Sequence, residues 1–578
     1  MSEQHTSSSA AAKSVDELIR EHYKPGAIYD NSHRQYNTLS EKRIRQLCSV
    51  IRGKVDWMAK MNDAEIRTRW IAEATQQEPA LTDKELTYVF AELEYCASLH
   101  TTGCGIRMSP VEQVWISDSL IDTDTEEAVR RYAAILESVP DRQKDWHPNS
   151  NNQVLNLVHP SLYPIVYDRS MILDKPIPSP EAALQLESFG KCPGSFDKWR
   201  TAVKEISSTM GKEYYFLEKK KQTYEYDNNF ISKKYCWLPT EYWVDDDGSV
   251  EIKSYINNLH PVRHKEFYPT VAKVFSKFVP LLEQVVTDLA HPRDARVKPD
   301  IYNWHVTDEP EPKDYEASDY EERHERWMDG RQFVHPQPEP FVAPDRPTEP
   351  YRLRGRNLQA IFKMSNIELT PENPEYEGGS WHVEAMANER IIATGIYYYD
   401  VENITESSLA FRESFDQYVP YEQNDAEGVR LGYGLEGGFD VDQNIVQNVG
   451  DVETRNGRCI VFPNVYQHKV GGFKLADPTK QGHRKIFAFF FIDPSTRIPS
   501  TEIVPPQQQD WWTETLADAK PLSELPILVQ RTIYDNVSFP FGLDDAKSIR
   551  LDLMAERTAR NENAGEELFA PLFTLCEH

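Results

Sequence analysis

Two stretches of the sequence combine histidine, carboxylate and arginine side chains in a pattern that suits metal chemistry. In the first, GGSWHVEAMANERIIATGIYYYD, His382 and Glu384 are two residues apart. On an extended strand, this spacing places both side chains on one face. The second, GRCIVFPNVYQHKVGGFKLADPTKQGHRKIFAFFFID, carries His468 after one apolar strand and Arg484 at the start of another. Two imidazoles and one carboxylate form the facial triad that suits non-haem Fe(II) and leaves coordination positions open.

A histidine followed two positions later by an acidic residue is weak evidence by itself. The chain has 16 histidines and 92 acidic residues among 578, so such pairs arise by chance. His264 and Glu266 form a second pair, but in a helix-like context where this spacing does not share a face. His382 and Glu384 instead follow a Gly-Gly turn and precede a strand rich in Ile, Thr and Tyr. This context favours them as metal ligands, with His468 as the third.

Composition and charge exclude several classes of protein. A net charge of -28 argues against a nucleic-acid partner, because phosphate contacts need basic patches. The longest apolar run, Ile486 to Ile492, is far too short to span a membrane. The N-terminal MSEQHTSSSAAAK lacks the apolar core of a signal peptide and is typical of a disordered tail. The 7 cysteines are scattered without a CxxC pair, so we expect a reduced, cytoplasmic protein.

Changes in periodicity along the chain indicate five regions. We expect a disordered tail and helices over residues 1–140, and a mixed α/β region that buttresses the core over 141–307. An acidic, proline-rich linker or lid follows over 308–349, then a β-rich core over 350–510 and a C-terminal helical segment over 511–578. The overall class is α+β.

Local signals predict individual elements. Apolar residues at helical spacing indicate one helix from Leu39 to Met61 behind a candidate Ser40 cap, and Thr82 and Glu85 have the spacing of a capping box. A later long helix contains Pro280, which should kink or split it. In the β-rich core, strands are expected over 358–369, 391–399, 459–462 and 485–492.

The same residues resemble two known families. The first resemblance is to the motif of Fe(II)/2-oxoglutarate-dependent oxygenases, especially the prolyl-hydroxylase branch. Its features here are a His-x-acid pair, a strand ending in Tyr397-Tyr398, a distal histidine and an arginine opening the last strand. From about Leu81 to Trp512, the chain also resembles a large fungal family described only as a domain of unknown function. The strings SYINNLHP, GGSWHVE, FPNVYQH and ADPTKQGHRK carry this second resemblance, which implies no substrate.

The oxygenase resemblance implies a fold, a cofactor set and a reaction. It implies a double-stranded β-helix (a cupin-like jelly roll) with Fe(II) held by His382, Glu384 and His468. It also implies that Arg484 binds the far carboxylate of 2-oxoglutarate, with Tyr398 adding a hydroxyl donor. A small metabolite would be hydroxylated or otherwise oxidised, with release of succinate and CO2. One departure is Glu384, since the superfamily commonly has Asp there and the extra methylene moves the ligand oxygen by about a bond length.

Two other functions use the same triad. One is a non-catalytic, metal-binding cupin-like protein, and the other is a zinc-dependent hydrolase. Arg484 and Tyr398 distinguish them from an oxygenase, because a hydrolase needs no anchor for 2-oxoglutarate. A small-molecule substrate is favoured over a protein side chain, because no modular peptide-binding or nucleic-acid-binding segment is visible, and no membrane partner is expected.

Overall fold

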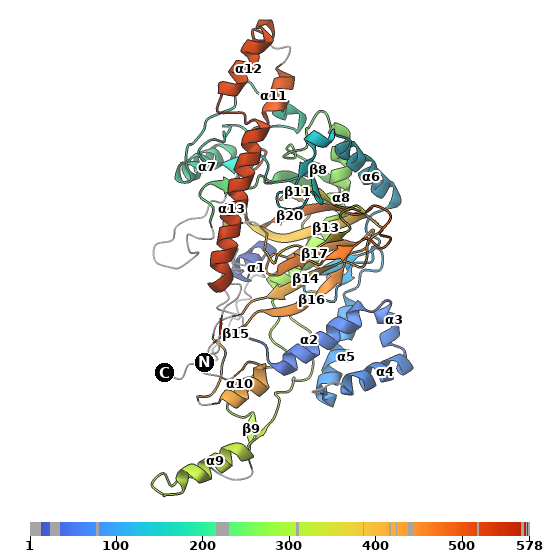
Figure 1. Ribbon diagram of the computed structural model, residues 1–578, viewed down its shortest axis with the longest axis vertical. Helices are drawn as coiled ribbons and strands as arrows, with labels where there is room; N and C mark the ends of the chain where they lie inside the picture. The colour runs from blue at the N-terminus through green and yellow to red at the C-terminus, as the bar shows by residue number, and fades with distance from the viewer. Residues whose placement is uncertain are drawn as a thin grey trace, which may run out of the picture.

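The computed structural model arranges helices around a central set of antiparallel sheets (Figure 1). Figure 1 shows the sheets in the middle of an elongated molecule, with α12 (Ile527–Asn536) at one end and α9 (Tyr320–Gly330) at the other. Most of the expected N-terminal tail, residues 1–12, lies outside the described residues. The structure describes residues 13–22, 35–76, 80–214, 231–307, 311–384, 386–415, 418–423, 425–436, 443–516, 520–567, 572–573 and 575.

The N-terminal helices begin at caps that the sequence partly predicts. Thr82 and Glu85 form the expected capping box, with the Glu85 carboxylate accepting from the Thr82 backbone N–H at 2.8 Å. The single helix expected from residue 39 to 61 is instead two helices, since the chain turns at Asp56 with a positive φ of 54°. Thr38, not Ser40, caps the first one by accepting from the Glu41 backbone N–H. Besides α9 and α12, the α-helices are α1 (Val15–His22), α2 (Leu39–Gly53), α3 (Trp57–Met61), α4 (Ala64–Thr75), α5 (Asp83–Ser98), α6 (Thr123–Glu137), α7 (Phe196–Met210), α8 (Tyr268–Ala290), α10 (Ala426–Tyr433), α11 (Gln509–Thr515) and α13 (Leu543–Glu567).

A ten-stranded sheet forms the largest element of the fold. Its main path runs β1-β2-β17-β13-β20-β11-β4-β3, and β7 and β8 join at β11, with every pairing antiparallel. Six of its strands come from residues 107–252, outside the expected β-rich core, so the sheet is wider than the sequence predicts. The strands are β1 (Arg107–Met108), β2 (Trp115–Ser117), β3 (Asp145–Trp146), β4 (Val154–Val158), β7 (Thr240–Val244), β8 (Val250–Ile252), β11 (Arg356–Leu369), β13 (Ile391–Glu402), β17 (Cys459–Pro463) and β20 (Gly482–Ile492).

Smaller sheets complete the β structure. The three-stranded sheet β16-β14-β18 contains the strand that carries His468, and four further strand pairs are β12-β19, β9-β10, β15-β21 and β5-β6. Their bounds are β5 (Ile165–Val166), β6 (Tyr235–Cys236), β9 (His305–Val306), β10 (Gln332–Phe333), β12 (Glu375–Tyr376), β14 (Ser408–Glu413), β15 (Gln443–Asn444), β16 (Gln447–Glu453), β18 (Gln467–Val470), β19 (Phe473–Lys474) and β21 (Leu572–Phe573). Short 3-10 helices are η1 (Asp141–Gln143), η2 (Glu181–Leu184), η4 (Lys265–Phe267), η5 (Ala387–Glu389) and η6 (Leu522–Glu524).

Helix α8 covers one face of the large sheet. Its Phe275 and Phe278 rings lie 5.0 and 5.9 Å from Phe489 of β20. Pro280 lies inside α8 without splitting it, so α8 is one continuous helix from Tyr268 to Ala290. Side chains alternate along a strand, so the residues of β20 on either side of Phe489 point to the opposite face of the sheet. That second face, here called the inner face, carries Arg484.

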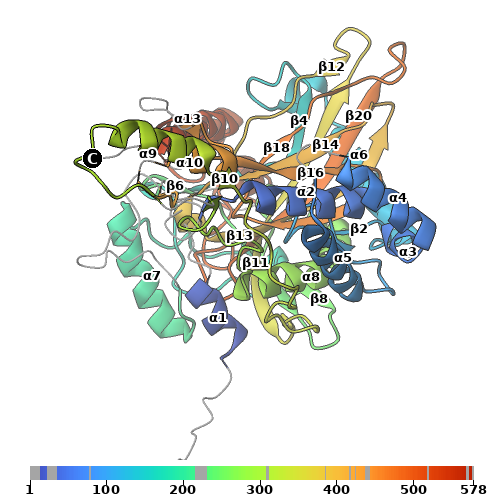
Figure 2. The same ribbon diagram turned by 90° about the horizontal axis from the view of Figure 1, so that it is seen from below.

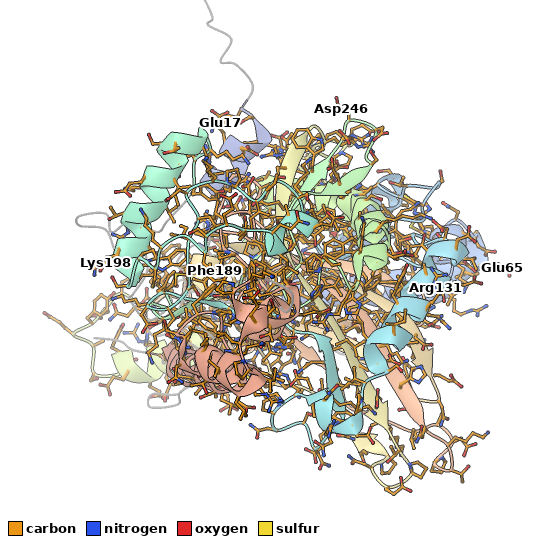
Figure 3. The ribbon with its side chains drawn as sticks, turned by 90° about the horizontal axis from the view of Figure 1, so that it is seen from above. Glu17, Glu65, Arg131, Phe189, Lys198 and Asp246 are labelled. Atoms are coloured by element: carbon orange, nitrogen blue, oxygen red, sulfur yellow. The ribbon has the colours of Figure 1, made fainter. Side chains whose placement is uncertain are left out.

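The other helical groups lie around the sheets. Seen from below, α2 to α5 gather on one side and α7 on the other (Figure 2). Seen from above, the labelled charged residues Glu65, Lys198 and Asp246 lie at the rim (Figure 3). Within the segment expected to be a linker or lid, the chain forms α9 and β10, and Arg346 contacts Asp288 of α8 at 2.5 Å. Among the described helices, none combines the length and apolarity needed to cross a membrane.

The packing of α8 on the sheet leads to a prediction about Gly395 of β13. A Cβ atom at this position would lie 2.7 Å from Phe278 and 2.9 Å from Phe491. Gly395→Ala should therefore destabilise the fold by about 1–3 kcal/mol through overpacking. Thermal unfolding would show a lower midpoint. Gly103→Ala is the matched control, because nothing lies within 4 Å of its Cβ position, and equal midpoints for the two variants would contradict this packing.

Candidate metal centre

The two candidate histidine ligands are held together by their own backbones. His468 lies on β18, and His382 lies in the chain segment that pairs with it as an isolated antiparallel bridge. The backbone N–H of His382 donates to the carbonyl of His468 at 3.1 Å, and that of His468 donates back at 2.9 Å. The two rings are consequently neighbours, with centroids 4.3 Å apart.

The carboxylate of Glu384 completes a three-residue cluster. Its Oε1 lies 3.6 Å from Nε2 of His382 and 3.3 Å from Nε2 of His468. One ligand atom from each residue lies within 4.8 Å of the others. The side chain of His468 is 4% exposed, that of Glu384 14% and that of His382 34%, so the cluster is open on the His382 side. Two nitrogens and one oxygen at this spacing can share one metal ion.

Neighbouring groups set the protonation of the cluster. Nδ1 of His382 lies 2.8 Å from the Ser380 carbonyl, which can only accept. The Nδ1 hydrogen therefore belongs to this bond, and Nε2 keeps a lone pair directed at the cluster. Nδ1 of His468 is buried and meets no partner among the described residues.

Electrostatics keep the carboxylate ionised. Burial opposes the charge, but the imidazoles of His382 and His468 outweigh it and hold the pKa of Glu384 well below its usual range. At His382, burial lowers the pKa, but Glu384 outweighs this effect and the pKa lies above its ordinary value. At His468, burial has the larger effect and the pKa lies below its ordinary value. The cluster thus presents an anionic ligand at neutral pH.

Asn464 fixes the backbone at Glu384 and was not singled out from the sequence. Its side-chain oxygen accepts from the Glu384 N–H at 3.0 Å, and its amide nitrogen donates to the Glu384 carbonyl at 3.1 Å. The same amide nitrogen also donates to the carbonyl of Ile391, at the start of β13, at 3.1 Å. The only signal in the sequence is the position of this asparagine directly after an apolar strand, within FPNVYQH.

Arg484 is buried, and the residues around it offer it few partners. The residue is 3% exposed, and its Nη1 donates to the Ser407 hydroxyl at 2.9 Å. The rings of Tyr398 and Phe473 lie 5.5 and 5.2 Å from its Cζ. Within the described part of the chain, no carboxylate lies within 4.0 Å of the guanidinium, and its Nε has no hydrogen-bond partner. Burial lowers the pKa of Arg484, although Tyr398 and Tyr376 counteract this shift.

The strand register relates the surroundings of Arg484 to the His382, Glu384 and His468 cluster. His468 lies directly opposite Phe411 of β14, and Ser407 comes four positions before Phe411. Residues an even number of positions apart on a strand share a face, so Ser407 and His468 line the same face of the small sheet. Ser407 therefore lies about 13 Å along the chain from Phe411, the residue that His468 faces.

Two other sequence-predicted residues are placed clearly. Lys485 follows Arg484 but pairs with Glu137 and Asp400 at 3.0 and 3.6 Å, on the opposite side of β20. Tyr398 contacts Arg484 through its ring. Of the residues that contact Arg484, Ser407 and Phe473 could not be identified from the sequence, because they meet Arg484 only across strands.

Comparisons with known proteins identify a family but no activity. The family model described as Protein of unknown function (DUF4246) matches residues 83–515. No curated protein matches the chain. A solved structure described as the Fe(II)/(alpha)ketoglutarate-dependent dioxygenase TqaL is similar at 10% identity, over 46% of this chain and 72% of that chain, with a TM-score of 0.21. A bsmA homolog from Methylobium petroleophilum PM1 is similar at 8% identity over 25% and 45% of the two chains, with a TM-score of 0.15. Scores this low carry no argument about this chain.

The role of Asn464 can be tested directly. Asn464→Ala removes the hydrogen bonds that hold the Glu384 backbone, so the carboxylate should lose its fixed position. We expect the affinity for Mn(II) to fall by about 10–100-fold, as is typical when a supporting residue of a metal site is removed. Isothermal titration calorimetry measures this change. Asn62→Ala is the control, because the exposed Asn62 side chain donates to the nearby Met58 carbonyl. Equal Mn(II) affinity in both variants would exclude a supporting role for Asn464.

Proposed function

The chain belongs to the family described as Protein of unknown function (DUF4246), and on that premise we propose that it is a non-haem Fe(II)- and 2-oxoglutarate-dependent dioxygenase acting on a small metabolite. His382, Glu384 and His468 would hold the metal. Arg484, packed against Tyr398, would bind the cosubstrate.

The donor set fits Fe(II). Two imidazole nitrogens and one carboxylate oxygen converge, and the ordering contacts from Ser380 and Asn464 act on the ligands themselves. Three protein ligands leave positions free for a bidentate cosubstrate and for oxygen. The longer side chain of Glu384 still brings its oxygen next to both histidines, so replacing Asp by Glu does not move the carboxylate out of reach.

The observation that carries the proposal is the buried guanidinium of Arg484, which has no ion-pair partner among the described residues. A buried guanidinium has five N–H donors, and here one of its nitrogens has a partner in the Ser407 hydroxyl. Burying a charge without a counter-ion is costly, so the surroundings of Arg484 favour an anionic ligand. A carboxylate of 2-oxoglutarate would supply that counter-ion in the planar, bidentate geometry that arginine prefers. A zinc hydrolase has no need of such an anion site.

Strand order supports a jelly-roll core for this enzyme. Four strands, β11, β13, β17 and β20, are neighbours in the large sheet, whereas β14, β16 and β18 form the small one. The chain passes between these two sheets repeatedly, as a double-stranded β-helix requires. The backbone bridge between His382 and His468 then joins the small sheet to the segment that precedes β13.

The residues of the chain would divide the work between binding and orientation. Fe(II) and 2-oxoglutarate, when bound, would supply the oxidising chemistry, in which 2-oxoglutarate is converted to succinate and CO2. Arg484 fixes the far end of the cosubstrate. The aromatic rings of Tyr398 and Phe473 exclude water from that end, which strengthens the charge pairing. Glu384, held ionised, offsets part of the metal charge.

Loss of a histidine ligand should abolish metal binding. We expect His382→Ala and His468→Ala to bind Mn(II) at least about 100-fold more weakly while the thermal midpoint stays near that of the wild type. His483→Ala is the control, because His483 pairs with Asp400 at 2.9 Å on the opposite side of β20. With Fe(II) and oxygen, wild-type protein should convert 2-oxoglutarate to succinate, and both ligand variants should not. Full metal occupancy in His468→Ala would remove that residue from the site.

Loss of Arg484 should separate cosubstrate binding from metal binding. Removing one partner of a desolvated charge pair costs about 2–5 kcal/mol, so Arg484→Ala should weaken 2-oxoglutarate binding by roughly thirty-fold to several-thousand-fold. Calorimetry should show unchanged Mn(II) affinity in this variant. Lys485→Ala serves as the control and should keep both affinities. If 2-oxoglutarate binds Arg484→Ala as well as wild type, Arg484 is not the anchor, and the hydrolase and binding-protein alternatives gain weight.

A further inference from the structure

A second cation, Lys363 of β11, lies on the inner face of the large sheet. The register pairs Lys363 with Ala488 and Ile367 with Arg484. Opposed residues of an antiparallel pair share a face, and residues an even number of positions apart do so as well. Lys363 therefore lies on the same face as Arg484. Its neighbour Phe362 points the other way and packs on Phe487 at 4.7 Å.

Lys363 is partly buried and has no ion-pair partner in the described part of the chain. Among the described residues, no carboxylate lies within 4.0 Å of its Nζ. Lys485 on the adjacent strand is different, because it pairs with Glu137 and Asp400. Burial lowers the pKa of Lys363, and the charge of Glu384 partly restores it. The ring of His468 packs on Phe462 at 4.8 Å, and Phe462 pairs with Thr394 of β13. Thr394 in turn pairs with Phe490 of β20, two positions from the partner of Lys363, so the metal cluster and Lys363 lie on the same inner face.

Two histidines near Lys363 do not neutralise it. The rings of His147 and His159 lie 5.3 Å apart. Burial, together with the nearby charge of Lys363, lowers the pKa of His147 to about 4 and that of His159 well below its usual range. His159 lies beside Lys363 because the preceding Val158 pairs with Met364 of β11, and its Nδ1 accepts from the Ser161 N–H at 3.2 Å. The next cation, Arg550, is already paired with Asp145 at 2.6 Å.

Lys363 and Arg484 start from separate positions along the inner face. Along β20, the partner of Lys363 lies four positions from Arg484, which is about 13 Å. In the loaded site, a divalent metal and Arg484 would balance Glu384 and the dianionic cosubstrate. The charge of Lys363 is left over, and a buried cation without a counter-ion is unfavourable.

We propose that Lys363 binds an anionic group of the substrate, a carboxylate or a phosphate, beside the metal centre. This inference rests on the proposed function, and it adds the substrate class: a small metabolite with an acidic group. The acidic group would then hold the substrate at a fixed distance from the metal.

The test uses small anions as probes on the intact protein loaded with Mn(II) and saturating 2-oxoglutarate. Bound Mn(II) accelerates the NMR relaxation of ligand protons that approach it. Acetate and methyl phosphate are titrated against neutral acetamide, and the comparison of the two anions separates a carboxylate site from a phosphate site. Wild type should bind at least one anion, and acetamide should show no saturable effect. Lys363→Met should weaken anion binding by about tenfold or more, whereas Lys485→Met should not.

The outcomes distinguish this inference from the proposed function. Equal relaxation by acetamide, or unchanged anion binding in Lys363→Met, would overturn the assignment. Loss of 2-oxoglutarate affinity in Lys363→Met would instead place Lys363 in the cosubstrate site and overturn it too. If wild type binds neither Mn(II) nor 2-oxoglutarate, the proposed function fails. Saturation-transfer NMR on metal-free protein then still decides whether acetate binding depends on Lys363.

Discussion

The register of β20 between β11 and β13 is the constraint on which the rest of the structure depends. Alternate residues of this strand point to opposite faces, so Phe487, Phe489 and Phe491 pack toward α8 while Arg484 points to the inner face. A slip by one residue would expose the phenylalanines to the inner face and bury Arg484 under the helix. The apolar packing of α8 therefore also determines where the cation lies.

Backbone hydrogen bonds position the candidate metal ligands, as packing positions Arg484. His382 and His468 are paired through their main chains, and Asn464 holds the backbone of Glu384 with two further bonds. Little of this depends on the ligand side chains themselves. A substitution at a ligand should therefore change the chemistry of the cluster more than the path of the chain.

Local patterns in the sequence were sufficient to find the candidate ligands but not their surroundings. His382 and Glu384 stand out because a turn and a strand flank them, and Arg484 because it opens an apolar strand. Asn464, Ser407 and Lys363 act across strands, and a single sequence does not show which strands are neighbours. The width of the large sheet was missed for the same reason, since short strands such as β1 and β2 have too few residues for a clear alternation. The jelly-roll topology stays a prediction that the strand order supports.

The backbone pairing of His382 with His468 also bears on which metal the protein carries. Because the folded chain already holds two nitrogen ligands together, the apo site needs little rearrangement to accept an ion. Such a site follows the general order of divalent affinities, in which Cu(II), Ni(II) and Zn(II) bind more tightly than Fe(II). The ion found after purification would then reflect the metals available in the cell and the medium. In the proposed enzyme, metal supply would therefore control iron loading, and exchange of iron for zinc would stop the proposed oxidation without unfolding the protein.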